Sequence, residues 1–127
     1  MTSPEKQASL PALDQQILDA VYRIILQRKQ SADGEKSYVK SLYDKGLDKI
    51  LSKIGEEATE TAVAGKGGDR EEIVNEMADL FFHSLVLLGY YGIEPEEIYA
   101  ELKHRFGTSG IEEKASRADS RVEKQLP

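Results

Sequence analysis

Residues 53–80 read KIGEEATETAVAGKGGDREEIVNEMADL, and this stretch decides the fold. Segments with apolar residues at helical spacing lie on both sides of the turn GKGGD at 65–69. Glycines supply the left-handed backbone conformation that ends helices, so this turn closes the first segment. Asp69 offers an N-cap oxygen to the second segment, and Glu72 three residues later completes a pattern typical of a capping box. Helices joined by so short a turn pack antiparallel, which predicts a helical hairpin.

Helical periodicity continues on both sides of this hairpin, and no run of alternating β-branched residues predicts a strand. We predict helices over residues 12–29, 38–45, 47–64, 70–88 and 94–106, with a loop at 30–37. The sequence therefore predicts an all-α, antiparallel bundle of four to five helices. We expect one domain over residues 1–117, frayed at 1–10, and a disordered tail at 118–127. The apolar segment at 80–91 is expected to be buried on most sides, in a dimer core.

The composition is that of an ordinary globular chain, and it argues against several classes of function. The chain has 127 residues, 23 acidic against 17 basic, with a net charge of −6, which argues against a protein that mainly grips nucleic-acid phosphates. It contains no cysteine, so disulfides, zinc–thiolate sites and thiol nucleophiles are excluded. The N-terminus lacks the pattern of a secretory signal, and no apolar run reaches the roughly 20 residues that span a bilayer. We therefore expect a cytoplasmic protein with no membrane or nucleic-acid partner.

Acidic residues form a stripe beside the predicted apolar face of each hairpin helix. The acids are Glu56, Glu57 and Glu60 on the first helix and Glu76 and Asp79 on the second. A helix turns by about 100° per residue, so the first group borders a face that includes Ile54 and Ala58. One such stripe alone is most simply a solvated helix face. Two stripes facing each other across a hairpin would repel, and this arrangement favours a binding site.

A divalent cation neutralises such a cluster more readily than protonation, which would need pKa values far above the usual value of about 4. A set of carboxylate ligands selects a hard ion, magnesium or manganese, rather than zinc. Magnesium held by carboxylates keeps several waters and typically shares its coordination with substrate phosphates. The two stripes therefore predict a magnesium site used in phosphate chemistry.

Basic residues and a histidine continue the stripes, and their pattern allows two interpretations. Lys49 and Lys53 are either structural, through an ion pair between Lys53 and Glu57, or they bind phosphate. His83 lies one turn after Asp79. It is either an ordinary buried histidine or a residue that orients the metal ligands by hydrogen bonding without binding the metal itself.

His104 and Gly55 are not part of the acidic stripes. His104 lies in the basic last turn of the final predicted helix and is expected to be structural. Gly55 directly precedes the acids and lowers helix stability by about 1 kcal/mol relative to alanine. It either clears space for a ligand or a neighbouring helix, or it is simply tolerated. The chain has no glycine-rich phosphate loop followed by lysine, and no serine or cysteine in a nucleophile arrangement.

The segment SYVKSLYDKGLDKILSKIGEEATETAVAGKGGDREEIVNEMADLFFHSLVLL at 37–88 resembles the phosphoribosyl-ATP pyrophosphatase family, within the all-α MazG-like nucleoside triphosphate pyrophosphohydrolases. The shared signature of the larger group is E-E-x-x-E followed by E-x-x-D, here at 56–60 and 76–79. The features SY at 37–38, KG at 45–46 and GD at 68–69 narrow the resemblance to the family. The segment RFGTSGIEEKASR at 105–117 also resembles its C-terminal part, so the likeness covers about residues 12–117.

The resemblance implies a magnesium-dependent homodimer that hydrolyses phosphoribosyl-ATP to phosphoribosyl-AMP and pyrophosphate, the second step of histidine biosynthesis. It implies the metal ligands Glu57, Glu60, Glu76 and Asp79, the catalytic residues Glu56 and Glu57, and the phosphate-binding residues Lys49, Lys53, Lys114 and Arg117. Glu56 would be a further ligand or the base that orients water. Many relatives are fused to the cyclohydrolase of the next step, and this chain is expected to be the stand-alone form.

The resulting hypothesis is that magnesium binds the triphosphate oxygens, while a water oriented by a glutamate attacks at the α–β linkage and pyrophosphate leaves. Two alternatives stay open from the sequence. One is a house-cleaning pyrophosphohydrolase of the same superfamily, which would act on damaged nucleotides. The other is a helical interaction module whose acidic stripes bind a basic partner.

Overall fold

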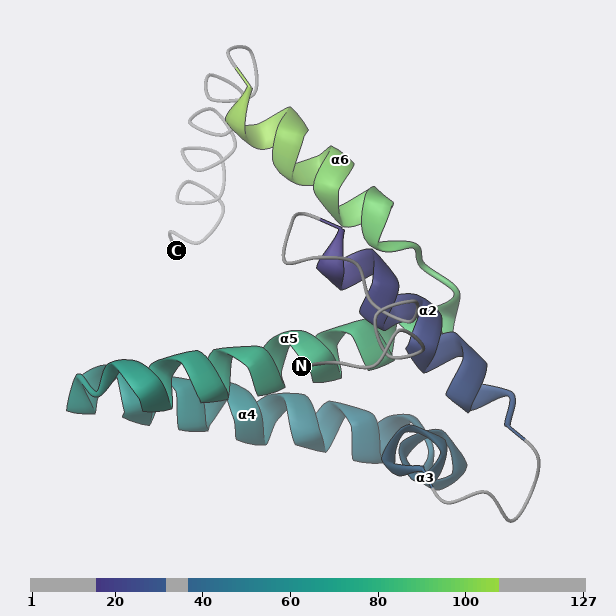
Figure 1. Cartoon of the computed structure of the whole chain (residues 1–127), viewed down its shortest axis with the longest axis horizontal. Coiled ribbons are helices and arrows are strands. Elements are labelled where there is room, and N and C mark those ends of the chain that lie inside the picture. The colour runs from purple at the N-terminus through teal and green to yellow at the C-terminus, as the bar shows by residue number, and fades with distance from the viewer. Residues whose placement is uncertain (1–15, 32–36, 108–127) are drawn as a thin grey trace, which may run out of the picture. The chain divides into compact units, whose positions relative to one another are not determined.

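The computed structural model describes residues 16–31 and 37–107, which form five helices and no strand (Figure 1). The helices are α2 (Ile17–Lys29), α3 (Tyr38–Lys45), α4 (Leu47–Gly67), α5 (Arg70–Tyr91) and α6 (Pro95–Phe106). The predicted all-α fold is confirmed. The start of the first predicted helix at 12–15, the tail at 118–127 and the residues Lys114 and Arg117 lie outside the described residues, so their roles stay predictions.

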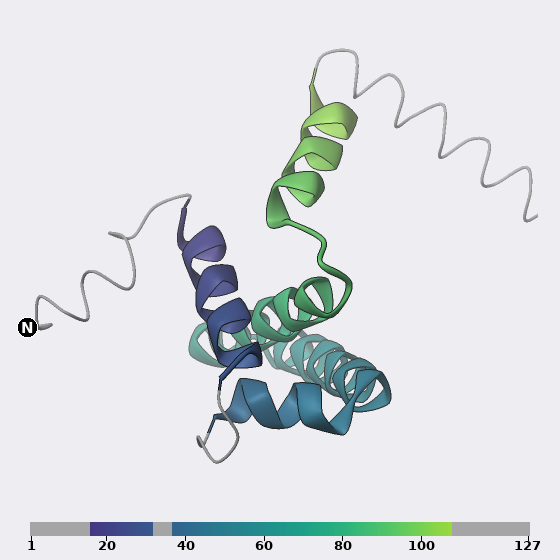
Figure 2. The same cartoon turned by 90° about the vertical axis from the view of Figure 1, so that its right-hand side faces the viewer.

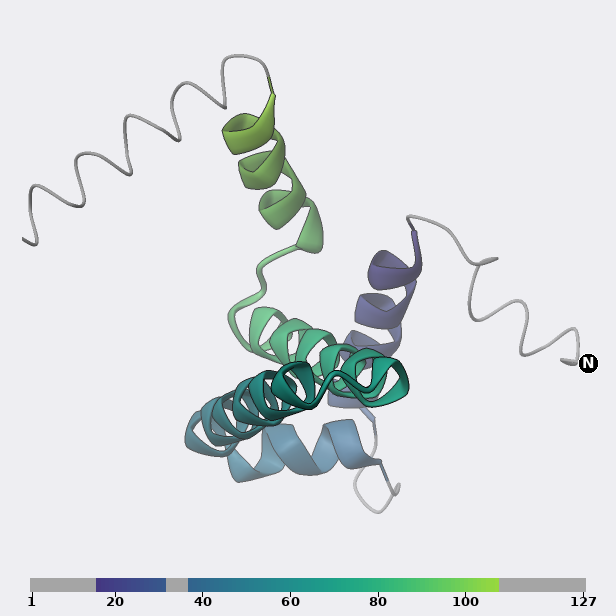
Figure 3. The same cartoon turned by 90° about the vertical axis from the view of Figure 1, so that its left-hand side faces the viewer.

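The hairpin of α4 and α5 is the central element of the unit formed by α2 to α5. The two helices lie side by side and antiparallel along most of their length (Figure 1), and Figure 2 views them close to end-on. Helix α3 runs across α4, and α2 packs against both α3 and α5 (Figures 1 and 2). The end of the hairpin that carries Gly68 and Asp69 extends beyond α2 and α3 (Figures 1 and 3). The hairpin prediction is confirmed, and among the described helices of this unit neither α2 nor α3 covers the end of the hairpin at the turn.

The core of this unit lies where α2 and α3 meet the hairpin. Its buried residues are Tyr22, Ile25, Val39, Leu42, Ile50, Leu85 and Val86. Two polar contacts tie the helices together at the edge of this core. The Tyr43 hydroxyl donates to the main-chain oxygen of Val86 at 2.7 Å, and the Lys29 ammonium donates to the oxygen of Gly89 at 2.9 Å. Both contacts reach the C-terminal half of α5, so the opposite half is held mainly by α4.

The turn of the hairpin confirms the predicted N-cap and corrects the predicted helix end. The Asp69 carboxylate accepts from the backbone N–H groups of Glu71 and Glu72 at 3.0 and 3.4 Å, as an N-cap residue does. Helix α4 was predicted to end at Ala64, but it continues through Gly67. Gly68 has a φ of 79°, and it is therefore the residue that ends the helix.

The end of α5 also lies later than predicted. The helix was expected to stop at Leu88, before a glycine, but it continues to Tyr91 and Gly92 ends it with a φ of 67°. Gly89 is a helical residue whose missing side chain serves packing, because a Cβ there would overlap the Tyr43 hydroxyl. The glycine predicted to end the helix, Gly89, therefore lies about one turn before Gly92, which does end it.

The apolar segment 80–91 is only partly buried within the single chain. Leu85 and Val86 are buried in the core, whereas Phe81 and Tyr91 are 49% and 60% exposed in this chain. Helices α2 and α3 cover only part of α5, and the expected burial of the rest in a dimer core stays a prediction. None of the described helices is long and apolar enough to cross a membrane.

Helix α6 belongs to a second unit, which begins at Glu94. Pro95 occupies its first turn, and Glu94 and Glu97 form a reciprocal capping box. Its last turn carries Lys103, His104 and Arg105, the charge order that the helix dipole favours. The predicted bounds of this helix are confirmed, and the single-domain organisation stays a prediction.

The substitution Gly89→Ala should lower the free energy of unfolding by about 1–3 kcal/mol, because the new Cβ displaces the Tyr43 hydroxyl from its bond to Val86. Urea unfolding at a fixed protein concentration measures this change. Gly55→Ala is the matched control, since a Cβ at Gly55 meets nothing within 4 Å. It should raise the free energy of unfolding by up to about 1 kcal/mol. Equal stability of the two variants would contradict the packing role of Gly89.

Candidate functional site

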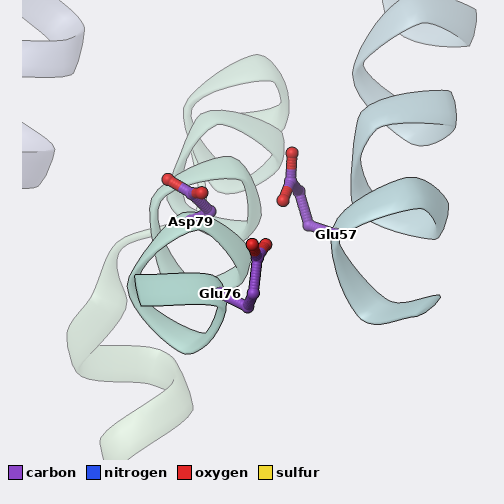
Figure 4. Close-up of side chains that lie close together, drawn as sticks. All are labelled: Glu57, Glu76 and Asp79. Carbon is purple, nitrogen blue, oxygen red and sulfur yellow. The ribbon is translucent and has the colours of Figure 1, made fainter. Parts of the chain in front are cut away.

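Three carboxylates from the two hairpin helices converge at one point. Glu57 comes from α4, and Glu76 and Asp79 lie one turn apart on α5 (Figure 4). One oxygen atom from each carboxylate lies within 4.8 Å of the others. The predicted meeting of the two acidic stripes is therefore confirmed for these three residues, and together they can hold a metal ion.

Glu57 occupies a core position rather than the border of the core. Its side chain is buried, with 6% of the residue exposed. Ile50 lies seven residues before it and Ala64 seven residues after it, and both are buried as well. Ala58, which was predicted on the apolar face, is exposed. The prediction that the acids only border the core face is thus wrong for Glu57. This residue lies on the buried face of α4, which packs against α5.

Two carboxylate oxygens of this cluster are buried without a hydrogen-bond partner among the described residues. They are Oε2 of Glu57 and Oε2 of Glu76. Burying an ionised oxygen with no donor is costly, and native proteins usually satisfy such atoms with a partner or an ion. Three carboxylates with unused oxygens form a donor set that suits a hard divalent cation. The residues present therefore fit a metal ion.

Glu60 does not join this group of three, but it contacts one of its members. A hydrogen bond with Glu60 raises the pKa of Glu76 to about 7, and burial and the charges of Glu60, Glu57 and Asp79 raise it further in the same direction. A hydrogen bond between two carboxyl groups requires a proton on one of them. Near neutral pH the cluster thus relieves part of its repulsion by holding a proton, and a cation could replace that proton. The predicted ligand role of Glu60 stays a prediction.

Lys53 stands beside the acids on the same helix. Its ammonium lies 3.2 Å from Oε2 of Glu56 and 3.6 Å from Oε1 of Glu57. The hydrogen bond with Glu56 raises the pKa of Lys53 above its usual value. The ion-pair interpretation of Lys53 is therefore confirmed, while a second role toward phosphate stays a prediction. Lys49 is exposed one turn earlier, and nothing tests its predicted phosphate contact.

Tyr38 reaches the edge of the site from α3, and sequence reasoning missed it. Its hydroxyl lies 2.8 Å from Nε2 of the buried His83. Burial raises the pKa of Tyr38, the charge of Lys53 lowers it, and the charges of Glu57 and Asp79 raise it. The phenol is therefore close enough to the charged residues of the site to feel their electrostatic field. The helical pattern could not reveal it, because its hydroxyl meets the hairpin from a separate helix. The only sequence signal was its place in the family-like pair SY at 37–38.

An open pocket lies beside the acidic cluster on the side toward the hairpin turn. Its lining combines hydroxyl, carboxylate and small apolar groups, from Thr59, Glu60, Val63, Ala64, Glu72 and Glu76. Glu60 and Glu76 belong to both the pocket and the surroundings of the cluster. A ligand held at the three carboxylates would therefore have room to extend along the hairpin.

Comparisons with known proteins agree with this geometry. Residues 18–106 match the family model described as Phosphoribosyl-ATP pyrophosphohydrolase. A phosphoribosyl-ATP pyrophosphatase of Geobacter metallireducens is 71% identical over 101 residues, which cover 80% of this chain and 92% of the relative. A protein of the same name from Geotalea daltonii is 64% identical over 105 residues, covering 83% and 98%. Another from Geobacter sulfurreducens is 65% identical over 101 residues, covering 80% and 93%. The match spans the hairpin and its acidic cluster, and the chain belongs to the phosphoribosyl-ATP pyrophosphohydrolase family.

Proposed function

We propose that this chain hydrolyses phosphoribosyl-ATP to phosphoribosyl-AMP and pyrophosphate, with magnesium held by its acidic hairpin. This is the reaction expected of the family, and it is the second step of histidine biosynthesis. One observation carries the assignment of the site: two buried carboxylate oxygens, on Glu57 and Glu76, belong to a cluster with Asp79 and have no hydrogen-bond partner within residues 16–31 and 37–107. We also propose a cytoplasmic location, as the sequence pattern led us to expect.

Three residues would hold the cation, namely Glu57, Glu76 and Asp79, with Glu60 as a fourth that gives up its shared proton. When bound, magnesium neutralises charge on the triphosphate oxygens and orients them; manganese could substitute. The rigid placement of Glu57 in the hairpin contact favours this role, because a buried ligand needs no ordering when the cation arrives. Charge balance favours it as well, since a cation removes the mutual repulsion of the acids.

Glu56 is suited to orient and deprotonate the attacking water. Its side chain is 52% exposed, whereas the side chain of Glu57 is 8% exposed, so Glu56 is the acid that water reaches. In the proposed step a water oxygen bonds to phosphorus at the α–β linkage and its proton passes to Glu56. The anhydride P–O bond breaks and pyrophosphate leaves with the bonding electrons. Lys53 and Lys49 lie on the same helix face and would offset the charge of the phosphates.

The chain is also proposed to act as a homodimer. Val74, Met77 and Phe81 form an apolar stripe on α5, and they are 61%, 41% and 49% exposed in the single chain. Their spacing places them on one face of the helix. Large apolar side chains gathered on one face are typical of an interface, and the family resemblance implies a second copy of the chain as the partner.

The substitutions Glu57→Gln and Asp79→Asn should each lower kcat for phosphoribosyl-ATP by at least about 100-fold, since each removes a charged oxygen from the cation site. Release of pyrophosphate, with ATP and modified nucleoside triphosphates as comparison substrates, measures this. Glu71→Gln is the control, because Glu71 is an exposed acid in the first turn of the same helix. Circular dichroism should show unchanged helicity in all three. Near-normal turnover in either site variant would contradict the assignment, and preference for a modified nucleotide would favour the house-cleaning alternative.

The stability of the metal-free protein should fall as pH rises from about 4.5 to about 7. The pKa of Glu76 is raised from 4.5 to about 7 in the folded chain, so the folded state keeps a proton that the unfolded state loses over this range. Thermal melts at several pH values measure the effect, and Glu76→Gln should make the fall less steep. Magnesium should raise the melting temperature more at pH 8 than at pH 5. An ion that leaves the melting temperature unchanged at both pH values would instead favour a non-enzymatic acidic module.

The substitution Phe81→Glu should convert the proposed dimer to monomers, because it places a charge within the apolar stripe on α5. Analytical ultracentrifugation of the full chain at several concentrations measures the mass. Glu71→Gln again serves as the control and should keep the mass of the wild-type protein. A wild-type mass of one chain at every concentration would contradict the dimer without bearing on the cation site.

A further inference from the structure

We propose that Tyr38 is a positioning residue for the cation site, acting through His83 on the turn of α5 that carries Asp79. The inference rests on the proposed function, and it assigns to α3 a part in a site that otherwise belongs to α4 and α5.

The hydrogen bonds around His83 have defined directions. Nδ1 of His83 lies 2.7 Å from the main-chain oxygen of Asp79, and Nε2 lies 2.8 Å from the Tyr38 hydroxyl oxygen. A carbonyl oxygen only accepts, so Nδ1 carries a proton and donates it. In the neutral ring Nε2 is then the acceptor, and the Tyr38 hydroxyl donates to it. The Asp79 carbonyl thus sets the tautomer, and the Tyr38 hydroxyl from α3 pairs with the acceptor nitrogen that this tautomer leaves.

Packing holds the imidazole in this orientation. His83 is 4% exposed, and its ring stands edge-on to Phe82 at 5.0 Å and to Tyr38 at 5.7 Å between centroids. A buried ring nitrogen without a partner is costly, and Tyr38 satisfies Nε2 from another helix. Removal of this one hydroxyl would leave Nε2 buried without that partner, which favours the other tautomer and so weakens the bond to Asp79.

The cation site depends on this turn of α5 more than on any other part of the cluster. Glu57 is fixed by burial in the hairpin contact, whereas Asp79 is exposed, so the position of its carboxylate follows from the position of its backbone. Tyr38, the first residue of α3, bonds to His83, which in turn bonds to the main-chain oxygen of Asp79. Removing a residue that hydrogen-bonds to a metal ligand and orients it typically weakens metal binding about 10- to 100-fold.

The chain offers a matched control for the test. Tyr43 lies on the same helix as Tyr38, and its hydroxyl also donates to α5, to the Val86 oxygen at 2.7 Å. It contacts the core end of α5, away from the acids. Tyr38→Phe and Tyr43→Phe therefore remove the same atom and the same kind of link between helices, one beside the site and one remote from it.

Calorimetric titration with magnesium chloride alone should show that Tyr38→Phe weakens magnesium binding by about tenfold. Tyr43→Phe should lower the melting temperature of the metal-free protein but keep the wild-type dissociation constant within twofold. Kinetics at saturating substrate should show a lower kcat for Tyr38→Phe at low magnesium, and recovery when magnesium is raised. A Tyr38→Phe variant with the same magnesium affinity as Tyr43→Phe would overturn the inference.

A double-mutant cycle tests the route through His83. His83→Phe keeps a buried ring and removes both hydrogen bonds, so it should weaken magnesium binding as Tyr38→Phe does. The double variant should be no weaker than His83→Phe, because the two residues act as one unit. Independent, multiplying effects would overturn the inference. A wild-type chain that binds no magnesium would overturn the proposed function as well, whereas normal wild-type binding with an unaffected Tyr38→Phe variant would overturn only the role of Tyr38.

Discussion

Burial of the Glu57 carboxylate between α4 and α5 is the constraint around which the rest of the site is arranged. A single ionised group in a helix contact is unfavourable unless a partner compensates it. Lys53 supplies part of that compensation from the side at 3.6 Å, but no donor in the described part of the chain reaches Oε2 of Glu57. Two further acids, Glu76 and Asp79, lie close to it on α5 and increase the local excess of negative charge. The hairpin is thus held in a form that gains stability from any cation placed between its helices.

The surroundings of the cluster differ on its two sides. Toward the core, α3 covers the hairpin and Tyr38 reaches His83, so the ring behind Asp79 is enclosed. Toward the hairpin turn lie an open pocket and exposed apolar residues such as Val63 and Val74, which no other described helix of this unit covers. A cation would be fixed from the first side, while a long substrate has room on the second. Family membership and this asymmetry agree with a site for an extended nucleotide.

The sequence predicted the elements better than it predicted which side chains are enclosed. The hairpin, the Asp69 cap and the last helix followed from local chemistry, because caps and helix periodicity depend on neighbouring residues. The pairing of acids across the hairpin followed from the same periodicity. The burial of Glu57 could not be predicted in this way, since a charged residue is expected to lie outside the apolar face of a helix. Tyr38 and Gly89 were not recognised either, because their roles depend on helices that are distant in sequence. Gly55 keeps no packing role within the described chain, which leaves open space beside the acids.

The short turn at Gly68 and Asp69 has a consequence for how the site forms during folding. Glu57 and Asp79 are only 22 positions apart in the sequence, and every residue between them belongs to the hairpin itself. Closing so short a segment costs little chain entropy, and contacts of this kind form before contacts between distant parts of a chain. The three carboxylates can therefore meet as soon as the hairpin closes, before α2 docks on α5. A cation present at that stage would stabilise a partly folded chain, so the ion could speed folding as well as support catalysis.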